Sequence, residues 1–214
     1  AAGTQDAAIT TFLTAVNQAA IHYNLPAIYV SFEHEPDSKQ HQVNGTPTQF
    51  IAAWDHVRQL AAQDGLNWND GGRLHWAWIM IRTSFDNHWA SEFWPGNTNV
   101  DIIAIDGYND PGCSGGKPNE TPTTVFGPAL AFDAANASPP VFISEWGSTD
   151  NPTGTQATYV NQMQSYIAAN PVIAAALYWD TGNPGCQYSI NANPAAVSAM
   201  TTLGQSALMQ GHLS

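Results

Sequence analysis

Ala27-Ile28-Tyr29-Val30-Ser31-Phe32-Glu33-His34-Glu35-Pro36-Asp37, residues 27–37, is the stretch that decides the fold. Its first half is rich in β-branched and aromatic residues, and its second half is an acidic cluster followed by proline. A buried parallel strand has this composition when it delivers a carboxylate to the edge of a sheet. We therefore predict a strand over residues 27–34 and interpret Glu35 as a catalytic carboxylate.

A second stretch repeats this design, Pro140-Val141-Phe142-Ile143-Ser144-Glu145-Trp146-Gly147-Ser148. An apolar run is again followed by a glutamate, here Glu145, and then by an aromatic residue and glycine. Two strands that each end in a lone carboxylate suggest a hydrolase that works with a pair of acids.

Between and around these stretches, helical and strand patterns alternate. We predict helices over residues 6–23, 121–136, 155–169 and 194–209, a helix from Pro47 that Gly65 ends, and strands over 27–34, 73–81, 100–106, 140–145 and 173–179. Thr46-Pro47-Thr48-Gln49 has the pattern of a capping box with proline at the first helical position. The alternation, with right-handed crossovers, predicts a parallel α/β sheet or barrel.

In such folds the active site is built at the carboxyl ends of the strands. Polar and aromatic residues recur at these predicted ends: Glu33 and Glu35, Arg82, Asp106 with Tyr108, Glu145, and Trp179 with Asp180. Glu33 is expected on the same face as Glu35, as a supporting carboxylate or in an ion pair with Arg82 or Arg73. The recurrence of such residues predicts a site at this end of the sheet.

Composition narrows the class of ligand. The 214 residues predict one domain, 1–214, and Lys+Arg 5 against Asp+Glu 17 give a formal charge of −12 with no basic run. This charge argues against nucleic acid and anionic membranes as partners. Eight Trp and seven Tyr in a chain that is 10% charged favour a neutral ligand with flat apolar faces, such as a sugar.

The positions of the cysteines indicate the cellular compartment of the protein, and those of the histidines indicate whether it binds a catalytic metal. Cys113 and Cys186 lie in Gly- and Pro-rich segments, and we predict a disulfide with Cα atoms about 4.4 to 6.8 Å apart. A disulfide indicates an oxidising compartment, so we expect a secreted protein. The seven His form no His-Glu-x-x-His motif and no Cys/His cluster, and there is no phosphate-binding Gly loop, so we expect no catalytic metal and no cofactor. No apolar run is long enough to predict a transmembrane helix.

With these residues in place, the chain resembles the retaining glycoside hydrolases of clan A, and within the clan it resembles family 26, which includes β-mannanases. His34-Glu35-Pro36 resembles the end of the fourth barrel strand, where the family has His before the acid/base Glu. Ile143-Ser144-Glu145-Trp146-Gly147 resembles the seventh strand and its nucleophile. Asp106-Gly107-Tyr108 resembles the sixth strand, whose Tyr contacts the nucleophile, and Tyr178-Trp179-Asp180 resembles the eighth, whose Trp floors the sugar subsite.

The resemblance implies a (β/α)8 TIM-barrel type of fold in which this chain supplies only the strands equivalent to 4–8. One helix precedes the Glu35 strand, where the family has three βα units. The outer strand edges, residues 27–32 and 173–178, would then expose unpaired backbone. Either the chain is a truncated form of such a barrel, or another chain or a second copy of this one completes it, and we expect the latter.

The resemblance also implies roles for individual residues. Glu35 would be the acid/base, Glu145 the nucleophile and Tyr108 the residue that orients Glu145, with carboxyl groups about 5 to 5.5 Å apart. Substrate contacts are expected from His34, Asp106, Trp89, Trp146 and Trp179. The implied activity is retaining endo-hydrolysis of a β-1,4-linked polysaccharide, mannan first and xylan or mixed-linkage glucan next. Two alternatives are a carbohydrate-binding barrel remnant without turnover and a fragment that merely folds.

Overall fold

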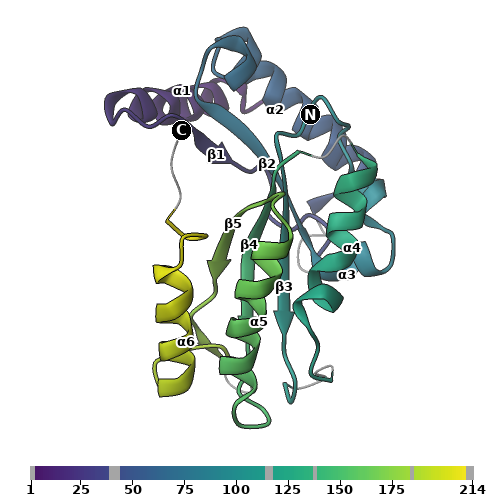
Figure 1. Cartoon of the computed structure of the whole chain (residues 1–214). Helices are drawn as coiled ribbons and strands as arrows, with labels where there is room; N and C mark the ends of the chain where they lie inside the picture. The colour runs from purple at the N-terminus through teal and green to yellow at the C-terminus, as the bar shows by residue number, and fades with distance from the viewer. Residues whose placement is uncertain (1–2, 39–43, 114–117, 137–138, 184–185, 211–214) are drawn as a thin grey trace. The chain divides into compact units, whose positions relative to one another are not determined.

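The computed structural model describes residues 3–38, 44–113, 118–136, 139–183 and 186–210 (Figure 1). The chain divides into two compact units, the first ending at Ala104 and the second beginning at Ile105. The five main strands are β1 (Ile28–Val30), β2 (Leu74–Ile81), β3 (Ile102–Asn109), β4 (Val141–Ser148) and β5 (Ile173–Tyr178). Their order in the sheet follows the chain. The predicted alternation of strands and helices is confirmed.

In the first unit, β1 pairs in parallel with β2 in a register that places Ile28 opposite Leu74. Its helical segments are α1 (Asp6–His22), α2 (Pro47–Gln63), η2 (Trp68–Asp70), α3 (Arg82–Asp86) and η3 (Ala90–Phe93). The predicted capping box is present, since the Thr46 side chain accepts from the Gln49 amide while the Gln49 side chain accepts from the Thr46 amide. Local sequence signals therefore set where α2 begins.

The core of the first unit forms around one face of α2. The Trp54 ring is fully buried and packs edge-on against Trp76 of β2, with ring centroids 5.9 Å apart. On the same helix, the buried Arg58 pairs with Asp101 at 3.1 Å, and Asp101 also accepts the Trp76 amide at 2.8 Å. These contacts fix α2 against β2 and the start of β3.

In the second unit, β4 pairs in parallel with β5, and α4 (Pro122–Ala135), α5 (Thr155–Ala169) and α6 (Pro194–Gln205) run beside the strands (Figure 1). A two-stranded antiparallel ribbon of β6 (Gly182–Asn183) and β7 (Cys186–Gln187) follows β5. The nearly continuous burial of β3 agrees with the apolar run that predicted a covered parallel strand.

Among the described residues, no helix has both the length and the apolarity to cross a membrane.

One predicted element is much shorter than expected. The strand predicted over residues 27–34 is confined to β1, because the chain turns out of extended conformation soon after Val30. Glu33 and Glu35 both have positive φ, 57° and 49°. Side chains in such a turn do not alternate as they do on a strand, so the expectation that Glu33 and Glu35 share one face of a strand is wrong.

Candidate functional site

The carboxyl ends of β3 and β4 bring Tyr108 and Glu145 together in the second unit. The Tyr108 hydroxyl donates a hydrogen bond to Glu145 Oε2, which is the contact expected from the sequence. Burial, followed by the hydrogen bond to Glu145, raises the pKa of Tyr108 far above its usual value. Tyr108 therefore stays protonated and acts as a fixed donor to the Glu145 carboxylate.

The ends of these two strands are themselves tied together. Asn109 is fully buried, and its side-chain amide donates to Ser148 Oγ at 3.0 Å. The Thr149 amide donates to the Asn109 carbonyl at 3.1 Å. These bonds hold the strand ends in register just beyond Tyr108 and Glu145.

Asp106 lies two residues before Tyr108 and has 3% of its surface exposed. The Ser144 hydroxyl donates to Asp106 Oδ1 at 2.6 Å. Ser144 and Glu145 are adjacent on β4, yet they contact Asp106 and Tyr108, which lie on the same face of β3.

A β-bulge in β4 accounts for this arrangement. Ile143 pairs with Ala176 and Trp146 with Tyr178, so β4 has one residue more than β5 over this interval. The extra residue breaks the alternation of faces, and bulges next to active sites re-aim side chains in this way. The bulge directs both Ser144 and Glu145 toward β3.

Trp146 requires a correction. It was expected to contact substrate, but its ring has 1% of its surface exposed and packs against Tyr178, with ring centroids 4.8 Å apart, and against Tyr159. Since Glu145 is directed toward Tyr108, the next side chain turns to the opposite face and enters the core. Trp179, by contrast, is 43% exposed just beyond β5.

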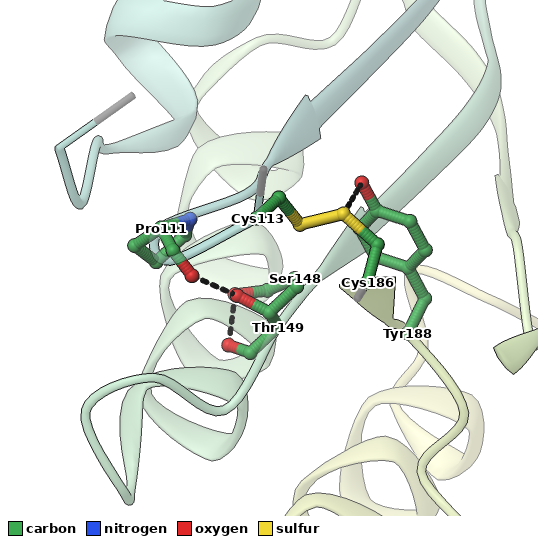
Figure 2. The surroundings of a disulfide bond; sticks show 6 residues. All are labelled: Pro111, Cys113, Ser148, Thr149, Cys186 and Tyr188. Atoms are coloured by element: carbon green, nitrogen blue, oxygen red, sulfur yellow. Dashed lines mark hydrogen bonds between the residues drawn. A yellow bond between two sulfur atoms is a disulfide. The ribbon is translucent and has the colours of Figure 1, made fainter. Parts of the chain in front are cut away.

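The predicted disulfide is present between Cys113 and Cys186, with Cα atoms 5.1 Å apart (Figure 2). It joins the loop after β3 to the segment after β5. Two residues beyond Cys186, the buried Tyr188 places its ring 4.8 Å from the ring of Tyr108. Sequence reasoning missed Tyr188, although its closeness to a loop cysteine was the available signal.

In the first unit, Glu35 is half-buried and His34 is exposed, both in the turn after β1. Glu33 accepts a hydrogen bond from the Asn44 side chain at 2.7 Å, and no ion pair joins it to Arg82 or Arg73 in the described part of the chain. Arg82 instead pairs with Asp86 at 3.0 Å. Of the two roles expected for Glu33, the ion pair is therefore absent from the described part of the chain, and the role of a supporting carboxylate stays a prediction.

The turn that carries Glu35 is anchored to β2 by Asp37. This carboxylate is 3% exposed and accepts the Ile81 amide, at 3.1 Å from Oδ2. Ile81 is the last residue of β2. The bond therefore holds the chain just after Glu35 against the carboxyl end of the neighbouring strand.

Trp89 borders a cavity of about 440 Å³ in the first unit, which Asp37 also lines. The ring is 48% exposed, so it presents a flat apolar surface. The cavity is also lined by Gly45, Thr46, Pro47, Ser84, Glu92 and Phe93. An exposed aromatic ring beside carboxylates and hydroxyls suits a neutral ligand that carries hydroxyl groups.

No protein-family model matches the sequence, and no curated protein matches it. Solved structures do match. The catalytic domain of the family 26 endo-β-1,4-mannanase of Bacillus sp. JAMB-750 superposes with a TM-score of 0.66 at 16% identity, covering 99% of this chain and 59% of that one. A family 26 β-mannanase from Bacteroides ovatus gives 0.62 at 11% identity, covering 96% and 59%. A Cellulomonas fimi endo-β-1,4-mannanase double mutant gives 0.63 at 14% identity, covering 97% and 48%.

This likeness confirms the predicted fold class. Five parallel strands with their helices match part of a (β/α)8 barrel. The chain spans less than two thirds of the length of each of these three structures. The likeness to these family 26 structures is one of fold.

Proposed function

We propose that this chain carries the catalytic carboxylates of a retaining endo-β-1,4-glycosidase, with mannan as the first substrate and xylan or mixed-linkage glucan as the next. The observation that carries the proposal is the hydrogen bond from Tyr108 to Glu145. A nucleophilic carboxylate has to stay ionised and correctly oriented, and a neutral phenol aimed at one of its oxygens supports both requirements. The mannanase titles of the structural neighbours favour mannan.

In the proposed mechanism, Glu145 attacks the anomeric carbon while Glu35 donates its proton to the glycosidic oxygen, which leaves as an alcohol. A covalent bond forms between a Glu145 oxygen and the sugar as the glycosidic bond breaks. Glu35, now a carboxylate, then takes a proton from water, and the water oxygen displaces Glu145. The mechanism requires the two carboxyl groups to lie about 5 to 5.5 Å apart, which remains a prediction.

Sugar contacts are proposed for the accessible rings and for polar groups beside the two glutamates. Trp89 and Trp179 each expose nearly half of their surface and can stack on pyranose faces. His34 follows from its position next to Glu35. Asp106 is 3% exposed and accepts the Ser144 hydroxyl, so its sugar contact requires that this bond open. Trp146 is left out of this set because its ring is enclosed in the core.

The outer strands support the proposal that further strands complete the barrel. β3 is buried along most of its length, whereas β1 exposes Tyr29 and β5 exposes Leu177, at 48% and 53%. In the described part of the chain, β1 pairs only with β2, and β5 only with β4. We propose that an N-terminal barrel part on another chain, or a second copy of this chain, pairs with these edges. The disulfide supports action outside the cell, where plant-type polysaccharides occur.

Hydrolysis of dye-linked mannan and of an aryl β-mannoside tests the proposed function. We expect Glu145→Gln and Glu35→Gln each to lower kcat by about 1,000-fold or more, because each loses a carboxyl group that reacts with substrate or proton. Two half-buried glutamates provide matched controls: Glu120→Gln for Glu145, and Glu33→Gln for Glu35. Both controls should remain within a few-fold of wild type.

Two outcomes would contradict the assignment. Equal loss in Glu120→Gln and Glu145→Gln would show that the losses come from disturbed folding. Binding of manno-oligosaccharides without any hydrolysis would favour the carbohydrate-binding remnant instead.

A further inference from the structure

The ring of Tyr188 packs against the ring of Tyr108. The two rings are tilted by 40° with centroids 4.8 Å apart, and Tyr188 is 8% exposed. Tyr108 reaches Glu145 only through its terminal hydroxyl, so a small rotation of its ring would carry that hydroxyl away from the carboxylate. A ring packed against Tyr108 restricts this rotation.

The backbone of Tyr188 is held more firmly than its position in a loop would suggest. Its amide donates to the Thr181 carbonyl at 3.0 Å, and its carbonyl accepts the Tyr178 hydroxyl at 2.6 Å and the Gln156 side-chain amide at 2.9 Å. The Gln156 amide also donates to the Ser148 carbonyl at 3.0 Å. Tyr188 is thereby tied to the end of β4, the strand that carries Glu145.

The disulfide adds a covalent constraint on the same segment. Cys186 lies two residues before Tyr188 and is bonded to Cys113, which follows β3 (Figure 2). The Tyr188 hydroxyl lies 3.9 Å from Cys186 Sγ, so the ring lies alongside the crosslink. The loops after β3 and β5 are therefore both linked to the position of Tyr188.

Gly147 makes room for this packing. A Cβ atom at Gly147 would lie 3.1 Å from Tyr188 Cδ1 and 3.4 Å from Tyr108 Cδ1. The first distance is tighter than ordinary van der Waals contact, and Tyr188 is a buried ring with little freedom to move. The absence of a side chain two residues after Glu145 lets both tyrosines pack over β4.

We infer that Tyr188 is a positioning residue, held by the Cys113–Cys186 crosslink and by Gln156 and Tyr178, that fixes the Tyr108 ring so that its hydroxyl stays on Glu145. The inference deepens the proposed function and rests on Glu145 being the nucleophile. Tyr188 acts through Tyr108 and touches no reacting atom.

The ionisation of Glu145 provides the readout. In the second unit, the titratable groups beside the Tyr108 and Glu145 pair are Asp106 and Tyr188, and burial raises the pKa of Tyr188 to about 12, so Tyr188 is neutral at ordinary pH. A donor on the ionised form favours ionisation, so loosening Tyr108 raises the pKa of Glu145. The acidic limb of the kcat/KM profile then moves to higher pH.

The test compares Tyr188→Ala, Tyr188→Leu and Tyr188→Phe with Tyr166→Ala as control. Tyr166 is a half-buried tyrosine in the same unit that packs near Phe126, with centroids 6.2 Å apart. The ionisation of Glu145 is measured in each variant by carbon-13 NMR of its carboxyl, and kcat and KM are measured on mannan.

For Tyr188→Ala and Tyr188→Leu, we expect a higher Glu145 pKa and a kcat about 10- to 100-fold lower at little change in KM. Tyr188→Phe keeps the ring and should behave like wild type. Tyr166→Ala should lower the melting temperature without moving the Glu145 titration. Cys113→Ser with Cys186→Ser should shift the titration in the same direction as Tyr188→Ala, which provides a second route if the tyrosine variants fold poorly.

An unchanged Glu145 titration in folded Tyr188→Leu, or an equal shift in Tyr166→Ala, would overturn the inference. The NMR titration needs no turnover, so the two proposals fail separately. A shifted titration in a chain that does not hydrolyse mannan supports the positioning role and contradicts the proposed function. Hydrolysis of mannan with the same kcat in the wild type and in Tyr188→Leu supports the proposed function and contradicts the positioning role.

Discussion

At the scale of single residues, two carboxyl groups of the second unit have opposite environments. Glu145 receives the Tyr108 hydroxyl, whereas Asp133 on α4 is 3% exposed and its Oδ1 has no hydrogen-bond donor among the described residues. Desolvation by burial raises the pKa of Asp133 to about 6. A charge buried in this way weakens the fold at neutral pH.

Asp133→Asn should therefore stabilise the protein in a pH-dependent way. The Asp133 carboxyl has a pKa near 3.8 in the unfolded chain and about 6 in the native state, so the native state binds this proton more tightly. The contribution of Asp133 to the free energy of unfolding is therefore fully present below pH 3.8 and is lost as pH rises through 6. Urea unfolding should show the Asp133→Asn variant up to about 3 kcal/mol more stable than wild type at pH 8 and unchanged at pH 3.5. Asp64→Asn, at an exposed carboxyl after α2, is the control. A gain that is equal at both pH values would contradict the account.

At this scale, the sequence predicted a side-chain contact correctly where a motif resembled that of a known family. Tyr108 was expected to contact Glu145 because Asp106-Gly107-Tyr108 resembles the sixth-strand motif of family 26, and the hydrogen bond is present. Trp146 and Glu33 were misplaced because the bulge in β4 and the turn after β1 break the alternation of faces. Neither the bulge in β4 nor the turn after β1 was marked by a local pattern in the sequence. The bulge depends on the pairing of β4 with β5, which a local pattern does not contain.

At the scale of elements, helix α2 shows how local chemistry sets a boundary. Thr46 and Gln49 exchange two hydrogen bonds at the helix start, and Pro47 occupies the first turn. Gly65, with φ of 65°, follows the helix end. All of these signals were readable in the sequence because they involve neighbouring residues only.

Thr46→Ala should lower the free energy of unfolding by about 1 kcal/mol, because it leaves the Gln49 amide without its acceptor. Thr48→Ala, at an exposed position inside the same helix, changes no cap and should alter stability by much less. Urea denaturation monitored by circular dichroism measures both. Equal losses in the two variants would show that the cap contributes nothing of its own.

At the scale of the whole molecule, the order of elements was predictable because each strand and helix has its own pattern. The alternation pointed to a barrel-type fold, and the structural neighbours share that fold with TM-scores of 0.62 to 0.66 for the three described above. The distance between the carboxyl groups of Glu35 and Glu145 was expected from the family resemblance alone, because strand and helix patterns do not contain it. The two residues lie in different compact units, and their separation depends on how the strands between them close.

The exposed edge of β5 should take part in association. Leu177 is 53% exposed on this strand, and Leu177→Lys should weaken pairing with a further strand. We expect size-exclusion chromatography with intact mass to show a particle larger than 23.0 kDa for the wild type and a smaller one for Leu177→Lys. Val197→Lys, at a 39% exposed position on α6, should change nothing. A 23.0 kDa wild-type monomer with full mannanase activity would contradict the proposed completion of the barrel.

The central claim is that Glu145 is the nucleophile of a retaining glycosidase, and the most direct measurement is trapping of the covalent intermediate. A 2-deoxy-2-fluoro-mannosyl donor with a good leaving group slows the second step more than the first, so the sugar accumulates on the nucleophile. Mass spectrometry of the peptides should show one fluoromannosyl group attached to Glu145, with labelling abolished in Glu145→Gln and retained in Glu120→Gln. Attachment to Glu33, Glu35 or Asp106 instead, or hydrolysis of mannan with inversion at the anomeric carbon, would contradict the account.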